Sequence, residues 1–201
     1  MGRRRRRIHI VDLDAAKAGQ PVNLEAIARI RDAVDVKSRS AAASERSSTS
    51  PKHSIAASIG SFSAPWRSGT APLVERAAKR WGDAIAVSLD ARDGKLAAAG
   101  WTEQTELVAL DLARDMNKAG VTRFIYTDIN RDGTHTGPNT TAIRELVLAV
   151  NARVISAGGV GAIEDVEALR DTGAHGAIIG RALYDGRVDL RAAIAKAGSQ
   201  S

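Results

Sequence analysis

The chain of 201 residues contains no cysteine and no uninterrupted apolar run of membrane-spanning length. The first absence excludes disulfide bonds, thiolate metal sites and a cysteine nucleophile. The second excludes a transmembrane helix, which needs roughly 20 apolar residues. No apolar segment follows the arginine run at residues 3–7, so the start does not resemble a secretory signal. These absences predict a cytoplasmic protein with no membrane partner.

The formal net charge of +6 is unevenly distributed along the sequence. Residues 3–7 supply five arginines, and residues 37–70 hold five lysines and arginines against one glutamate, so the remainder is net negative. A nucleic-acid-binding domain concentrates its basic residues on one folded face. Here they lie in one tail and one atypical segment, so we expect no nucleic-acid partner.

From residue 83 onward, strand-like and helix-like patterns alternate with short connections. Short apolar runs predict strands, and apolar residues at i, i+3, i+4 and i+7 predict helices. Four successive β-then-α units imply a parallel sheet with helices packed outside it. The predicted strands are residues 84–90, 123–128, 154–157 and 177–180, and the predicted helices run through residues 107–116, 143–150, 166–169 and 190–197.

One similar unit precedes this region. Residues 8–14 predict a strand, and Asn23 is a suitable N-cap for a helix over residues 24–30. Apolar spacing over residues 73–81 predicts another amphipathic helix. Between them, residues 37–70 contain eleven serines and no apolar periodicity, a composition typical of a flexible linker. A linker of this length contradicts a compact domain.

Polar residues and glycines follow the predicted strands at the edge where a parallel α/β sheet places its active site. Asp90 and Asp128 end adjacent strands, and two carboxylates there suit general acid–base catalysis. Gly158-Gly159 and Gly180-Arg181 each open a helix, an arrangement that binds phosphate through backbone N–H groups. Each feature has a simpler alternative, because a strand-end aspartate often caps a helix and a glycine pair often forms a tight turn.

Five motifs, taken together, carry a family resemblance. They are Ile8–Ala16, Ser88–Asp90 with Gly100–Thr102, Thr127–Thr134 with Gly137–Asn139, Ser156–Val160 and Gly180–Tyr184. Their order resembles the (βα)8-barrel phosphoribosylformimino-aminoimidazole carboxamide ribotide isomerases of histidine biosynthesis. The resemblance covers residues 8–36 and 71–197. The related cyclases of the same pathway usually lack the Gly-Trp loop and the Gly-Pro-Asn, so they fit less well.

The resemblance implies an α/β fold of the TIM-barrel type and an Amadori rearrangement. In this reaction an aminoaldose becomes an aminoketose on a small substrate that carries a phosphate at each end. One aspartate protonates the ribose ring oxygen, and a second removes the C2 proton. The resemblance assigns the acid to Asp90, with Asp128 and Thr127 assisting from the next strand.

The resemblance also implies how the substrate is held. Gly158-Gly159 and Gly180-Arg181 would bind one phosphate. Trp101 would stack on the flat heterocycle, and its alternative role is packing on the barrel rim. No cofactor and no metal are implied, and we expect a monomer.

Several parts of the family pattern are missing. The family's general base lies on a first strand, and none precedes residue 8; its phosphate turns after strands three and four are absent from residues 37–70. Codons can be chosen for residues 38–45 that, read one base earlier, encode Val-Glu-Val-Gly-Gly-Gly-Ile-Arg, the expected third strand and turn. Residues 58–69 likewise shift to Val-Asp-Arg-Val-Ile-Leu-Gly-Thr-Val-Ala-Leu-Gly. We therefore interpret residues 37–70 as translated out of frame, which predicts an incomplete barrel.

These observations divide the chain into five parts. They are a basic tail at residues 1–7, the second βα unit of a barrel at 8–36, the aberrant segment at 37–70, the fourth helix with βα units five to eight at 71–197, and a tail at 198–201. The expected function is the isomerisation, impaired in this copy. Two alternatives stay open: a non-catalytic half-barrel that binds phosphate, and a dual-substrate relative that also isomerises phosphoribosyl anthranilate.

Overall fold

The computed structural model describes residues 7–11, 25, 29, 37–41, 54–58, 71–98 and 101–198. Within this part of the chain, one sheet contains parallel strands in the order β1-β2-β3-β4-β7-β8-β9, so consecutive parallel strands are neighbours. The sequence pattern predicts this mostly parallel α/β arrangement. The strands are β1 Arg7–Val11, β2 Lys37–Ala41, β3 Ser54–Ser58, β4 Ile85–Arg92, β7 Arg123–Asp128, β8 Arg153–Ala157 and β9 Gly176–Ile178.

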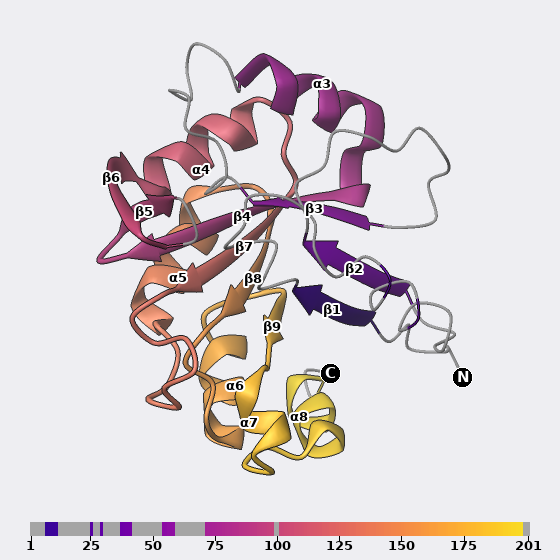
Figure 1. Cartoon of the computed structure of the whole chain (residues 1–201), viewed down its shortest axis with the longest axis vertical. Helices are drawn as coiled ribbons and strands as arrows, with labels where there is room; N and C mark the ends of the chain where they lie inside the picture. The colour runs from indigo at the N-terminus through magenta and orange to yellow at the C-terminus, as the bar shows by residue number, and fades with distance from the viewer. Residues whose placement is uncertain are drawn as a thin grey trace.

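Helices lie along the outer side of the curved sheet (Figure 1). An α-helix and a short 3-10 turn precede β4, and one or two helices follow each of the later parallel strands. None of the helices in the described ranges is long and apolar enough to span a bilayer. The helices are α3 Ala71–Trp81, η3 Gly82–Ala84, α4 Ala109–Lys118, α5 Thr140–Ala149, α6 Ile163–Arg170, α7 Arg181–Tyr184 and α8 Leu190–Ala197.

Two buried apolar clusters lie on opposite faces of the sheet. Side chains alternate between faces along a strand, so one set from β4, β7 and β8 packs against the helices and the other does not. The helix-facing cluster includes Val87, Leu89, Ala91, Phe124, Tyr126 and Val154 together with Leu112, Met116, Ile143, Leu146, Val166 and Leu169. Ala86, Ile125 and Ala157 form the second cluster. Membership of a cluster therefore assigns a face to each of these strand residues.

A hairpin that the sequence analysis did not predict follows β4. β5 (Lys95–Ala98) pairs antiparallel with the end of β4, and β6 (Glu103–Val108) pairs antiparallel with β5. Asp93 and Gly94 form the first turn with φ of 52° and 78°, the left-handed geometry that a two-residue hairpin turn requires. Trp101 lies in the connection between β5 and β6, so the hairpin determines where its indole goes.

The predicted elements and the observed ones agree in most places and differ at residues 37–70. β4, β7, β8 and β9 confirm the four later strands, and Glu25 and Arg29 are helical as predicted. Composition predicts no strand in residues 37–70, yet β2 and β3 lie there and link β1 to β4. A parallel ladder is made of backbone hydrogen bonds, so a serine-rich composition does not exclude it. Asn23, Gly100 and residues 1–6 and 199–201 lie outside the described residues.

Candidate active site

The registers of β4, β7 and β8 place Asp90 and Thr127 next to each other near the carboxyl end of the sheet. Asp90 pairs with Thr127, which in turn pairs with Ala157. Paired residues of parallel strands project from the same face, so both side chains lie on the face turned away from the helices. Asp128 pairs with Ala91 and lies on the helix-covered face. The structure therefore brings Asp90 and Thr127 together and separates Asp128 from them.

Both carboxylate oxygens of Asp90 accept hydrogen bonds from the chain. Ser88 Oγ donates to Oδ1 at 3.0 Å, and the indole Nε1 of Trp101 donates to Oδ2 at 3.1 Å. The Arg92 guanidinium donates to the Trp101 carbonyl oxygen at 3.3 Å. Trp101 has φ of 72°, a strained conformation for a non-glycine residue that surrounding contacts must hold. The hairpin thus keeps the indole beside the carboxylate, and stacking of Trp101 on a heterocycle stays a prediction.

Asp132 is a further carboxyl group of this site, and the strand-end rule used on the sequence missed it. It lies on the loop after β7, four residues beyond the end of the strand. Desolvation by the surrounding protein raises the pKa of Asp132, the negative charge of Asp90 raises it further, and a hydrogen bond from the Gly133 backbone opposes the shift. A carboxyl group whose pKa lies above its ordinary value is a candidate for general acid catalysis.

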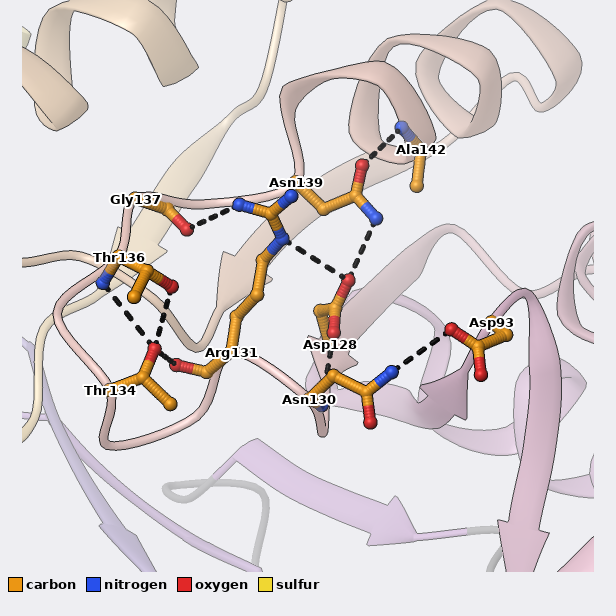
Figure 2. A network of polar contacts seen from close by, with 9 residues as sticks. All are labelled: Asp93, Asp128, Asn130, Arg131, Thr134, Thr136, Gly137, Asn139 and Ala142. Carbon is orange, nitrogen blue, oxygen red and sulfur yellow. Dashed lines mark hydrogen bonds and ion pairs between the residues drawn. The ribbon is translucent and has the colours of Figure 1, made fainter.

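Asp128 belongs to a polar network that braces the loop of residues 129–139 (Figure 2). Its Oδ1 accepts the backbone N–H of Asn130 at 3.1 Å, and its Oδ2 accepts Nδ2 of Asn139 at 2.7 Å. Arg131 Nε lies 3.8 Å from Oδ2, and the same guanidinium donates to the Gly137 carbonyl oxygen at 3.0 Å. These contacts give Asp128 a defined partner for each oxygen on the helix side of the sheet.

The glycine pair after β8 allows the loop of residues 129–139 to approach the sheet closely. Gly158 and Gly159 both have φ of 87°, which favours glycine. A Cβ on Gly158 would stand 2.8 Å from the Asp128 carbonyl oxygen, and one on Gly159 would overlap the Gly137 carbonyl oxygen. The Gly137 N–H donates to the Gly159 carbonyl oxygen at 3.0 Å. The pair therefore has a packing role, and its predicted phosphate role stays a prediction.

The turn after β9 contacts the same loop through charged side chains. Gly180 precedes α7, and a Cβ added there would meet nothing within 4 Å. Arg181 forms an ion pair with Asp185 at 3.2 Å and donates to the Gly133 carbonyl oxygen at 3.3 Å. His135 Nε2 lies 3.0 Å from Asp185 Oδ2. The predicted phosphate role of Gly180-Arg181 stays a prediction.

Comparison with known proteins places these features in a family and confirms the resemblance of the motifs. Residues 3–189 match the family model described as histidine biosynthesis protein. A relative from Dehalococcoides mccartyi, named 1-(5-phosphoribosyl)-5-((5-phosphoribosylamino)methylideneamino) imidazole-4-carboxamide isomerase, is 43% identical over 188 residues, which cover 93% of this chain and 77% of the relative. Relatives of the same name from Gloeothece citriformis and Magnetococcus marinus are 43% and 42% identical, over 96% and 94% of this chain and 76% and 79% of their own lengths. The chain therefore belongs to the histidine biosynthesis protein family.

Proposed function

We propose that the chain is an isomerase of histidine biosynthesis, as its relatives are named, and that it catalyses the aldose–ketose Amadori rearrangement that its motifs imply. The observation that supports this most is the register that puts Asp90 and Thr127 side by side on one face of the sheet, with Asp132 close enough for the charge of Asp90 to raise its pKa. A carboxyl group of raised pKa beside a second carboxyl group provides a proton donor and a proton acceptor in one site. Thr127 lies beside Asp90 on the same face.

The reaction needs one proton at the ring oxygen and the loss of another at C2. We propose that the Asp90–Asp132 pair serves as the acid predicted at Asp90, with the transferable proton held on Asp132. Protonation of the ring oxygen allows the C1–O bond to break, which leaves a Schiff base at C1. Removal of the C2 proton gives an enolamine with a hydroxyl group on C2. This enolamine takes up a proton at C1 and loses the C2 hydroxyl proton, so that the C2 carbonyl of the aminoketose forms. The resemblance assigns the base for the C2 proton to the first strand of the barrel.

The residues that we propose to bind the substrate lie along the same edge of the sheet. Gly158-Gly159 and Gly180-Arg181 would hold one phosphate, because the turns after the last two strands of such barrels usually bind phosphate. Trp101 would stack on the heterocycle. We expect the reaction to need no cofactor or metal, and the protein to act as a cytoplasmic monomer.

We further propose that the seven parallel strands are strands two to eight of a (βα)8 barrel. Their order and the outer position of the helices support this (Figure 1). Within the described ranges, β1 and β9 are the unpaired ends of that order. Residues 37–70 would be the out-of-frame segment. In that case β2 and β3 occupy the places of strands three and four with a foreign sequence. Sequencing the DNA around codons 37 and 70 tests that interpretation, which is wrong if no single-base slip restores the family's sequences for these two strands and the turns after them.

An assay of purified chain with the aminoaldose substrate tests the function. We expect Asp90→Asn and Asp132→Asn each to reduce kcat/KM by at least about 10²-fold, the usual contribution of a general acid. Asp111→Asn is the control, because Asp111 is exposed on α4 and forms an ion pair with Arg114 on the surface of the same helix. Unaltered turnover in both site variants would disprove the assignment.

The same preparation separates the alternatives. Binding of phosphate ligands without turnover would favour a non-catalytic half-barrel. Turnover of phosphoribosyl anthranilate as well would identify a dual-substrate enzyme.

A further inference from the structure

Asp128 follows Thr127 at the end of β7, but its side chain stabilises the loop of residues 129–139 instead of facing Asp90. It is only 7% exposed. It faces the helices, and its two oxygens accept from Asn130 and Asn139. Because both oxygens of this buried carboxylate accept hydrogen bonds from the protein, we expect Asp128 to stabilise the loop and not to contact a ligand.

Asn139 is held in one orientation by a second contact. Its Oδ1 accepts the N–H of Ala142 at 3.1 Å and thereby caps the first turn of α5. Because the amide oxygen faces the helix, the amide nitrogen is free to point at Asp128. This one side chain therefore joins the start of α5 to the end of β7 and closes residues 129–139 into a ring (Figure 2).

The closed ring determines where Asp132 lies. The Asp132 backbone N–H donates to the Asp128 carbonyl oxygen at 3.0 Å. Across the loop, Arg131 donates to the Gly137 carbonyl oxygen at 3.0 Å. The backbone on either side of Asp132 is thus attached to the same frame, and movement of Asp128 or Asn139 would carry Asp132 with it.

We propose that Asp128 is a positioning residue whose hydrogen bond to Asn139 fixes the loop so that the Asp132 carboxyl group is held near Asp90. The role of Asp132 in turnover rests on the proposed function, whereas its placement does not. A displacement of about 1 Å can lower a rate by about 10²-fold. Loss of this one bond leaves the Arg131 contact in place, so we expect kcat/KM to fall by about tenfold.

Three variants of the full chain test the proposal. Asn139→Ser retains an N-cap for α5 but removes the amide donor. Asp128→Asn places a second side-chain amide opposite the amide of Asn139, so the carboxylate acceptor is lost. Adding Asn139→Asp restores a donor–acceptor pair, with the donor now at position 128 and the acceptor at position 139. Asp189→Ala is the control, because Asp189 Oδ1 caps α8 through Ala192 at 2.7 Å and its loss weakens a different helix.

Two measurements separate positioning from simple stabilisation. The Asp132 carboxyl group is titrated by NMR, and amide exchange is followed over residues 129–139. In Asn139→Ser and Asp128→Asn, we expect the pKa of Asp132 to fall toward its ordinary value because the loop moves into water and away from Asp90. Loop exchange should accelerate about tenfold, as expected for loss of about 1.4 kcal/mol of local stability. The exchanged pair should restore both readouts, and Asp189→Ala should lower the Tm without altering either.

An unchanged titration of Asp132 in Asn139→Ser and Asp128→Asn, with stability alone reduced, would overturn the proposal. Failure of the exchanged pair to restore either readout would also contradict it. If Asp128→Asn does not fold, Asn139→Ser still gives the decisive comparison. Absence of turnover in the unmodified chain would refute the proposed function and leave both readouts interpretable.

Discussion

Replacing Gly159 with alanine measures how closely the loop of residues 129–139 packs on the turn after β8. At Gly159, φ is 87°, and an added Cβ would overlap the Gly137 carbonyl oxygen and stand 3.0 Å from Pro138 Cα. Gly94 provides a matched control, because its φ is 78° and an added Cβ meets nothing within 4 Å. Alanine at either position is strained by the backbone conformation, and only at Gly159 does it also collide with the loop.

The two contributions have separate magnitudes. The left-handed conformation costs an alanine about 1–2 kcal/mol at either position. Forcing a methyl group into a closely packed place adds about 1–3 kcal/mol. We therefore expect Gly159→Ala to lower the free energy of unfolding by about 2–5 kcal/mol and Gly94→Ala by about 1–2 kcal/mol, from the sum of these terms. Urea denaturation followed by circular dichroism measures both values. Equal losses would refute the close approach of Gly137 to Gly159.

Three other substitutions probe the core, the hairpin and the acid. Phe124→Ala should lower the free energy of unfolding by about 3–5 kcal/mol, because Phe124 is fully buried against the helices; a loss below 1 kcal/mol in the same denaturation assay would contradict that packing. Trp101→Phe keeps an aromatic ring but removes the donor to Asp90, and loss of about 1 kcal/mol predicts an approximately fivefold fall in kcat/KM. Unchanged kinetics would show that the indole N–H is dispensable. The raised pKa of Asp132 means that its favourable contribution to stability is complete below the ordinary value of 3.8 and is lost as the pH rises through the folded value. Asp132→Asn should therefore gain stability relative to the unmodified chain between pH 3.8 and neutrality, and a pH-independent difference in Tm would refute this.

The sequence predicted the helices well where burial enforces a period of 3.6 residues. Ile143 and Leu146 are buried on one face of α5, as their spacing indicates. Boundaries were less predictable: the helix expected through residues 107–116 begins at Ala109, and Leu107 is an exposed residue of β6. The Asp93-Gly94 pair is a strong hairpin signal. It could have revealed β5, because the apolar residues after it belong to a new strand.

The candidate site was only partly predictable, for physical reasons that differ between its residues. Asp90 and Thr127 follow from the rule that parallel strands place chemistry at their carboxyl ends. The face on which Asp128 lies depends on register with β4, which no single strand encodes. Asp132 reaches the neighbourhood of Asp90 only because its loop folds back on the sheet, so its role depends on tertiary contacts.

The loop of residues 129–139 is attached to three other βα units, and this has a consequence for recombination. Asn130 bonds Asp93 in the hairpin after β4, Gly137 bonds Gly159 after β8, and His135 contacts Asp185 after β9, each at 3.0 Å. A chimera that exchanges β7 and its loop with a relative therefore inherits a segment without its partners. Crossovers that leave all three partners with the loop should yield foldable hybrids, whereas crossovers between β7 and β9 should fail even where the joined pieces are similar in sequence.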